Sequence, residues 1–377
     1  MANLTKTNRR TNPAFWVLLA LTLLGVGLSI YRLVVGLGPS TNMNDHYPWG
    51  IWITVDLFLI PVAGAAFTIS LLSYFFGREH YHAIVRPAVL AGLIIYGIVA
   101  VLLFLDIGRW NQFYNILVPG YINLHSFLEE ISLSVTFYSI ILVLEAAPIF
   151  LEKWNITAPI KWIDRSIFFI AGAGIVFSVL HQSSLGSLFL IMQHKLHPLW
   201  WTGALPLLAY LQAIYTGLGM TAIAITLVWR AMKLPMDREL FRRLGQVMSL
   251  NLLLYGAVRF GDWMGSGELP LLFSGDAFSL LAWLEFGLGI IVPLAILLSK
   301  LVGHSAGPFW AGVFSLIGTF INRLMITWIG LAEPNPVGYI PSWVEWMITI
   351  GLIAGGFLLY SVIVRQFRLL PEAKTAH

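Results

Sequence analysis

The chain has 377 residues, of which 58% are hydrophobic and only 11% are charged. A soluble domain carries about 25% charged residues, so this composition excludes an ordinary soluble enzyme and predicts an integral membrane protein. The formal net charge of +4 comes from basic residues in short connections between apolar runs, a pattern that favours membrane topology over nucleic-acid binding.

Ten apolar runs follow one another along the chain, and a membrane span needs about 20 such residues. The runs begin near Pro13, Trp49, Pro87, Leu124, Ser166, Ala204, Leu244, Phe278, Pro308 and Trp343. The start of the chain is polar and lacks an A-x-A cleavage site, so the first run reads as a retained span. We predict an all-α membrane protein of about ten transmembrane helices with only short connections.

The basic residues predict the orientation of these spans. With a cytoplasmic N-terminus, 17 of the 22 Lys and Arg residues fall in cytoplasmic connections or termini. The other five lie at the outer ends of spans or in an outer loop: Arg32, Arg109, Lys195, Arg259 and Arg323. We therefore expect a multi-pass protein of the cytoplasmic membrane with both termini in the cytoplasm.

Ionisable and amide side chains within spans are costly and mark candidate functional sites. Most of them fall in one layer in the outer half of the membrane: Asp56, Asp106, Arg109, His125, Glu129, Glu130, His181, Gln182, Arg259, Asp262, Glu285 and Arg323. Glu145 alone lies clearly toward the cytoplasmic side. Since Asp56, Glu130 and His181 come from three spans at matching depth, we predict a site there.

A structural interpretation of the same charges stays open. Asp106 and Arg109, like Arg259 and Asp262, are three residues apart and could neutralise each other on one helix face. His125 or His181 alone could be a hydrogen-bonded histidine of the core.

A short internal sequence repeat suggests two related helix bundles. The segment DIGRW at 106–110 ends the third span and RFGDW at 259–263 ends the seventh. Asp106 precedes Glu129 by 23 residues, and Asp262 precedes Glu285 by the same number. This pattern predicts one four-helix bundle over about 49–190 and a second over about 204–330, within a single membrane domain with flanking helices.

Several segments resemble the NrfD-like, or polysulfide-reductase, family of membrane subunits. They are YPWGIWITVDL, LDIGRWNQFYNILVPGYINLHSFLEE, LHQSSLGSLFL, KLHPLWW, RFGDW, FSGDAFSLLAWLE and YIPSWVEWMITIG. They occur in order along nearly the whole chain, and the nearest branch is the one that serves nickel–iron hydrogenases and complexes of sulfur metabolism.

The resemblance implies a quinone-reactive subunit of a respiratory complex, with no haem. In such complexes a ferredoxin-like iron–sulfur subunit on the outer face passes electrons from a catalytic subunit, of hydrogenase or sulfur-metabolism type, to menaquinone or ubiquinone. Asp56, Glu130 and His181 would line the quinone site or deliver protons to it. Second-rank candidates are Trp49, Asp106, Arg109, His125 and Gln182.

The chain contains no cysteine, so it can hold no cysteine-ligated iron–sulfur cluster and would supply only the pocket and the protons. The outer loops 111–123 and 193–202 would dock the iron–sulfur partner. Glu130, Ser134, Tyr138 and Glu145 recur at near-helical spacing and could form a proton route from the cytoplasm, although Ser134 and Tyr138 could equally be packing residues.

Three alternatives remain open from the sequence. A b-type cytochrome needs two facing histidines, and only His125 and His181 qualify. A secondary transporter would show helix breaks at paired positions near the midplane, which the sequence does not. A purely structural anchor would leave the buried charges unexplained.

Overall fold

The computed structural model describes residues 13–45, 47, 49–75, 82–232, 237–331, 338–367 and 369. Some basic residues used to predict the orientation lie outside this part of the chain: Lys6, Arg9, Arg10, Arg78, Lys233, Arg368 and Lys374. Both termini of the chain also lie outside it, so their side of the membrane stays a prediction.

The described residues are almost entirely helical, as the all-α prediction requires. The helices are α1 (Pro13–Val35), α2 (Leu37–Ser40), α3 (Ile51–Ala63), α4 (Ala65–Ser70), α5 (His82–Asp106), α6 (Phe127–Leu151), α7 (Thr157–Leu188), α8 (Leu205–Met232), α9 (Arg238–Gly265), α10 (Ala277–Phe286), α11 (Val292–Leu298), α12 (Ala306–Leu324) and α13 (Trp343–Gln366). Helices suit a bilayer because each satisfies its own backbone hydrogen bonds.

Among the described residues, nine helical segments are long and apolar enough to cross a membrane. Two of them combine shorter helices: α3 continues into α4 over Ile51–Tyr74, and α10 into α11 over Ala277–Leu298. The seventh predicted span corresponds to α9, which has 28 residues but carries several charges and is not among the nine. It packs along α8, α11 and α12 in the same bundle of helices.

The second span bends where α3 meets α4. Pro61 lies inside α3, and the amide of Gly64 donates to the Pro61 carbonyl at 3.0 Å. A side chain at Gly217 of α8 would collide with the backbone at this bend, because a Cβ there would lie 2.4 Å from the Gly64 carbonyl carbon. Close approach of α8 therefore fixes the shape of the second span.

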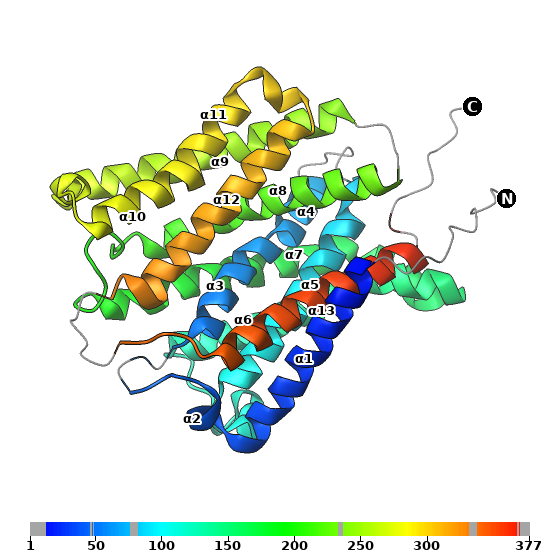
Figure 1. Cartoon of the computed structure of the whole chain (residues 1–377). Helices are drawn as coiled ribbons and strands as arrows, with labels where there is room; N and C mark the ends of the chain where they lie inside the picture. The colour runs from blue at the N-terminus through cyan, green and yellow to red at the C-terminus, as the bar shows by residue number, and fades with distance from the viewer. Residues whose placement is uncertain are drawn as a thin grey trace.

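Figure 1 shows the long helices running side by side, with α1 (blue) along α13 (red) and the α9–α11 group (yellow) at another side. In the first part of the chain α3 packs on α5, α5 on α6, and α6 on α7. In the second part α8 packs on α9 and α12, and α11 on both α9 and α12. α8 also contacts α3, α4 and α7, so it joins the two parts; their assignment as two related bundles stays a prediction.

The described basic residues of the predicted cytoplasmic connections lie where helices meet at one end of the molecule, called the basic end here. They are Arg86, Lys153, Lys161, Arg165, Arg230, Arg238, Arg242, Arg243, Lys300 and Arg365. The other end, called the outer end, holds the starts of α3, α6, α8, α10 and α13. These names follow the expected orientation, which remains a prediction.

Candidate functional site

His181 on α7 is the centre of a buried group of ring side chains. Its Nδ1 lies 3.2 Å from the carbonyl oxygen of Phe177, and its Nε2 lies 2.6 Å from the hydroxyl of Tyr96. A carbonyl oxygen only accepts, so Nδ1 carries a hydrogen, and in the neutral ring Nε2 accepts from Tyr96. Tyr138 packs on the same imidazole with ring centroids 5.9 Å apart.

The group joins three helices about 10 Å below the outer end of α7, since His181 precedes the last residue of that helix by seven positions. Tyr96 comes from α5 and Tyr138 from α6, and both side chains are almost fully buried. A buried tyrosine hydroxyl needs a hydrogen-bond partner, which Tyr96 finds in His181. We call His181, Tyr96, Tyr138 and the neighbouring Ser178 the histidine–tyrosine group.

Gln182 ties α7 to α3 beside this group. The bend in α3 diverts the Gly64 amide to the Pro61 carbonyl, so the Ile60 carbonyl lacks that helical partner. The side-chain amide of Gln182 donates to the Ile60 oxygen at 3.2 Å instead. The bend in α3 thus positions the helix next to His181.

Asp56 lies on α3 one turn before Ile60 and is 2% exposed. Neither of its carboxyl oxygens has a hydrogen-bond partner within the described part of the chain. Its electrostatic neighbour is Asp106 at the end of α5, and Asp106 in turn interacts with Arg32 and Glu345. We call the three acids Asp56, Asp106 and Glu345, together with Arg32, the carboxylate group.

The cation that interacts electrostatically with Asp106 is Arg32, although the two form no ion pair within 4.0 Å. The Arg32 guanidinium is fully buried and donates from Nη2 to the carbonyl oxygen of Ile107 at 2.8 Å. Arg109 is exposed at the start of the 3-10 helix Trp110–Leu117 and forms no ion pair with Asp106 within 4.0 Å. Asp106 and Arg109 therefore do not form the pair that their spacing allowed, because α5 ends at Asp106 and Arg109 is exposed beyond it.

Glu345 is a fully buried acid that the sequence reasoning did not include. Its Oε2 accepts from the amides of Asn42 at 3.0 Å and Ser342 at 2.7 Å, and its Oε1 accepts from the Tyr339 hydroxyl at 2.5 Å. Burial and the neighbouring carboxylate raise the pKa of Tyr339 above its usual value. The available signal was the Ser-x-x-Glu capping box at the start of α13.

The other predicted residues of this region lie closer to solvent or lipid. Glu129 and Glu130 are half-buried in the first turn of α6, and His125 is exposed just before that helix. Trp49 is half-buried, with its ring 5.9 Å from that of Phe189. Gln182 joins α7 to α3 next to His181, whereas the charged neighbour of Asp56 is Asp106 on α5. Glu130 lies about two turns farther out on α6 than Tyr138. A shared site of Asp56, Glu130 and His181 therefore stays a prediction.

A second set of charges lies between α8, α9, α10 and α12. Arg259 pairs with Asp262 at 3.6 Å, as the sequence pattern suggested, and donates to the carbonyl of Leu199. Asp262 accepts from the hydroxyl of Thr202 at 2.5 Å, and Trp263 donates to the same Leu199 oxygen at 3.1 Å. This pair therefore holds the segment before α8 against the end of α9.

Glu285 and Arg323 lie in the same region and have separate partners. Glu285 accepts from the Trp200 indole at 2.6 Å and the Asn322 amide at 2.9 Å. Arg323 donates to Gln212 at 2.5 Å. Each charge is thus held by polar side chains from a neighbouring helix or loop, which is the arrangement expected of buried ionisable groups in a membrane.

The segment 193–202, predicted to dock a partner, is tied down at the outer end. The amide of His197 donates to the Gly330 carbonyl at 2.8 Å, and its imidazole stacks on Phe278 at 4.4 Å. Partial burial lowers the pKa of His197 despite the nearby carboxylate of Asp276. The segment is therefore fixed to neighbouring parts of the protein by a hydrogen bond and a ring contact.

Chemically, the two groups near the outer end combine proton carriers with fixed charges. An imidazole hydrogen-bonded to a phenol can accept and return a proton, and protonated carboxyl groups can supply protons as general acids. Within the described residues, no cluster of three or more His, Asp or Glu side chains could hold a metal ion. The arrangement suits proton transfer to an organic substrate in the membrane.

Comparison with known proteins shows which family the chain resembles. The family described as "Polysulphide reductase, NrfD" matches residues 39–335. The chain is 33% identical over 353 residues to the "Probable Ni/Fe-hydrogenase 2 b-type cytochrome subunit" of Escherichia coli, covering 92% of this chain and 90% of that protein.

Two more distant relatives match over a similar length. The chain is 26% identical to the "Menaquinone reductase, integral membrane subunit" of Nitratidesulfovibrio vulgaris, covering 95% of this chain and 92% of that protein. It is 24% identical to the "Hdr-like menaquinol oxidoreductase integral membrane subunit" of Archaeoglobus fulgidus, covering 94% and 93%.

Proposed function

Since the family match spans most of the chain, the protein belongs to the NrfD polysulphide reductase family, and from this premise we propose that it is the quinone-reactive membrane subunit of a respiratory redox complex. In this proposal it exchanges electrons between an iron–sulfur partner on the outer face and menaquinone, or another quinone, in the bilayer. Two relatives whose names mention menaquinone or menaquinol support the substrate class. The hydrogenase relative supports a complex of hydrogenase type.

The observation that carries this proposal is the buried contact between His181 and Tyr96, close to the outer end of α7. Reduction of a quinone to a quinol consumes two electrons and two protons. The electrons come from the partner, because this chain has no cysteine for a cluster. A proton passed through Tyr96 to Nε2 would convert the neutral imidazole to imidazolium, which would give that proton to the quinone and return to the neutral ring. Asp56, in its protonated form, would supply the other proton and be left as the carboxylate.

A column of buried polar side chains favours proton supply from the basic end. Glu145 on α6 interacts electrostatically with Tyr74 and Tyr138 and lies beside Ser70. The hydroxyl oxygens of Ser70, Tyr138 and Ser178 are buried, with Ser70 next to Glu145 and Ser178 next to Tyr138. Such a row of hydroxyls is suited to ordered water, which would link Glu145 to His181. Quinone reduction at the outer end would then take up cytoplasmic protons and build membrane potential.

The residues do not fit a bis-histidine haem, although the name of one relative contains "b-type cytochrome". His125 is exposed before α6, whereas His181 is buried with both ring nitrogens engaged by Tyr96 and Phe177. A haem iron would need a free imidazole nitrogen from each of two facing histidines. We therefore expect a redox role for this chain without haem.

The fold gives little support to a secondary transporter. Helix interruptions occur at Gly64 and at the π-helical turn Leu71–Phe75 in the second span, and at the π-helical turns Gly287–Ile291 in the eighth and Met325–Ile329 in the ninth. In the predicted repeat the second span corresponds to the sixth, so these interruptions are not at equivalent positions. Transporters built from repeats place broken helices at matching positions around a midplane site.

The outer segments 111–123 and 193–202 are the proposed docking surface for the iron–sulfur partner. The first carries large exposed rings, among them Phe113, Tyr114 and Tyr121. Exposed aromatic side chains are typical anchors of protein interfaces. The second segment is held rigidly by the Arg259–Asp262 pair, which would keep the surface preformed.

The test is to purify the protein from its own membranes with its partners and to identify proteins and bound quinone by mass spectrometry. Quinone content and quinone-dependent turnover would be compared in wild type, His181→Gln and Glu130→Gln. His304→Gln and Asp164→Asn are matched controls, because both residues are exposed at the basic end.

We expect an iron–sulfur partner, a bound quinone, and turnover lost only in the outer-site variants. A preparation with neither quinone nor an iron–sulfur partner would contradict the proposal and favour transport or anchoring. Haem bands in a reduced-minus-oxidised spectrum would contradict the absence of haem.

A further inference from the structure

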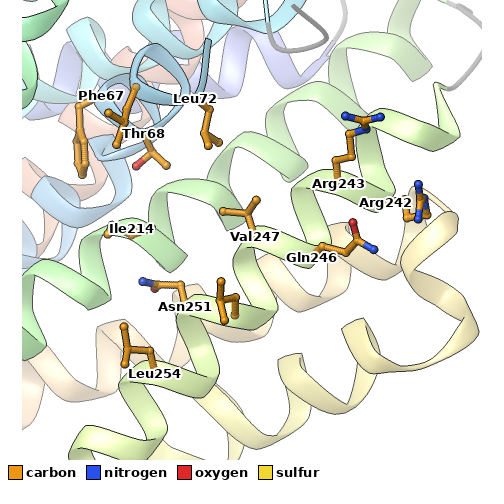
Figure 2. A pocket seen from close by; sticks show the side chains of 12 residues that line it. Phe67, Thr68, Leu72, Ile214, Arg242, Arg243, Gln246, Val247, Asn251 and Leu254 are labelled. Atoms are coloured by element: carbon orange, nitrogen blue, oxygen red, sulfur yellow. The ribbon is translucent and has the colours of Figure 1, made fainter. Parts of the chain in front are cut away.

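A cavity of about 530 Å³ lies between α4, α8 and α9. Figure 2 shows Arg242 and Arg243 at one end of it, Val247 along its length and Leu254 at the other end. Phe67 and residues that follow it line the facing wall. The cavity therefore has a charged mouth at the basic end and an apolar body.

The body of the cavity is as long as one leaflet is thick. Arg242 and Leu254 are twelve residues apart on one helix, which corresponds to about 18 Å. Half of a bilayer's hydrocarbon core measures about 15 Å. Leu250 and Leu254 are 69% and 51% exposed, so the cavity opens sideways into lipid. Its occupant would enter from the membrane rather than from water.

The mouth carries a positive charge. Arg242 and Arg243 both pair with Glu239, at 2.8 and 2.6 Å. One carboxylate against two guanidinium groups leaves a net charge of +1 at the mouth. The side chains of both arginines remain partly exposed, at 48% and 33%. Each guanidinium therefore keeps N–H groups that can donate to a further anion.

We propose that this cavity is a binding site for an anionic phospholipid of the leaflet at the basic end. The phosphate would lie between Arg242 and Arg243, since guanidinium groups bind phosphate oxygens in pairs. One acyl chain would lie along Val247 and Leu254. The lipid would fill the space between α4 of the first part of the chain and α9 of the second.

Two polar side chains lie deeper in the same cavity. Thr68 and Asn251 are 3% and 8% exposed, and each has a buried oxygen without a hydrogen-bond partner in the described part of the chain. These two polar side chains would also suit the head group of a quinone, which is the competing occupant of the cavity. The basic mouth and the lateral opening favour the phospholipid, and the experiment separates the two.

The test uses the complex purified in mild detergent and exchanged into nanodiscs that contain either phosphatidylglycerol or phosphatidylcholine. Native mass spectrometry of the released complex then counts the retained lipids. Arg242→Gln combined with Arg243→Gln removes the phosphate contacts, and Val247→Trp fills the groove without changing charge. Arg238→Gln is the matched control, because this exposed arginine precedes the same helix turn and does not line the cavity.

We expect wild type and Arg238→Gln to retain phosphatidylglycerol and not phosphatidylcholine. A basic residue at an anionic membrane surface contributes about fivefold in affinity, so the double variant should bind roughly 25-fold more weakly. Val247→Trp should also lose the lipid, while quinone turnover stays intact. Equal retention of both lipids, unchanged retention in the variants, or recovery of a quinone from this cavity would overturn the proposal.

Discussion

The hydroxyl of Tyr96 lies 2.6 Å from Nε2 of His181, and neither side chain is more than 2% exposed. The contact joins α5 to α7 at the depth of Asp56 on α3. It places a phenol in line with an imidazole whose other nitrogen is held by a backbone carbonyl. The orientation of the ring is therefore set by the protein before any substrate arrives.

We expect Tyr96→Phe to lower quinone turnover about tenfold, because it removes one hydrogen bond to the imidazole. His181→Gln should lower it about a hundredfold or more, because a general acid–base group contributes about 10²–10⁴-fold. Phe keeps the ring packing and removes only the hydroxyl. The measurement is quinol formation or oxidation by the intact complex in membranes, over a range of pH.

Tyr360→Phe is the control for Tyr96→Phe, since the Tyr360 hydroxyl is buried and has no partner in the described part of the chain. Equal loss of activity in both variants would show that the Tyr96 hydroxyl matters only for packing.

Glu145 provides a test of proton supply from the basic end. Glu145→Gln keeps the size and polarity of the side chain and removes its exchangeable proton. We expect electron transfer to continue while the membrane potential per turnover falls, as reported by a voltage-sensitive dye in vesicles. Normal turnover with an unchanged potential would remove Glu145 from the route, and Glu152→Gln at the same end serves as the comparison because Glu152 pairs with Arg86.

Arg259 should stabilise the outer end. Arg259→Gln leaves Asp262 without its cation and the Leu199 carbonyl without its charged donor. Breaking a buried pair costs about 3 kcal/mol or more, so the thermal midpoint of the purified protein should fall and segment 193–202 should become open to proteases. Arg109→Gln is the matched control, because Arg109 is exposed and forms no ion pair with the nearby Asp106. Protection equal to wild type in Arg259→Gln would contradict the anchoring role.

Packing between the first and last spans depends on two glycines. A Cβ at Gly351 of α13 would lie 2.6 Å from the Cα of Gly25 on α1. Small residues permit such close approach of membrane helices, and overpacking costs about 1–3 kcal/mol. We expect Gly351→Ala to lower the thermal midpoint and to reduce cross-linking between cysteines placed on the two helices. Gly27→Ala, which meets no atom within 4 Å, should change neither.

Glu345 should hold the start of α13 in place. Glu345→Gln puts an amide nitrogen against donors from Asn42, Ser342 or Tyr339, and an unsatisfied buried group costs about 1–3 kcal/mol. The thermal midpoint should fall even though the charge is removed from an apolar region. An unchanged midpoint would mean that the charge of Glu345 was as costly as its hydrogen bonds were favourable.

The spans were predictable because a run of about 20 apolar residues has few other structures available to it. The ends of the spans were less predictable. Hydropathy placed the start of the fifth span near Ser166, whereas α7 begins at Thr157. The intervening turns carry Lys161, Asp164 and Arg165 and are largely exposed, so the helix continues past the point where its sequence stops being apolar.

The partners of the buried charges were predictable only where they were local. The Arg259–Asp262 pair follows from a spacing of three on one helix. Arg32 beside Asp106 does not, because the two residues come from α1 and α5 and meet only through tertiary packing. The same holds for Tyr96 and His181, which are 85 residues apart. The roles of Asp56, Glu130 and His181 stay predictions.

The pairing of α1 with α13 has a consequence for how the protein is made. Asn42, just after α1, is hydrogen-bonded to Glu345, 303 residues later in the chain. During biosynthesis α1 enters the membrane long before its partner helix exists. Its apolar surface must therefore be stable alone in lipid, which fits its many exposed large side chains such as Leu23, Ile30 and Val34. Insertion of α13 is then the event that closes the structure, so a translation arrest before that helix would leave every other span in the bilayer but the fold unfinished.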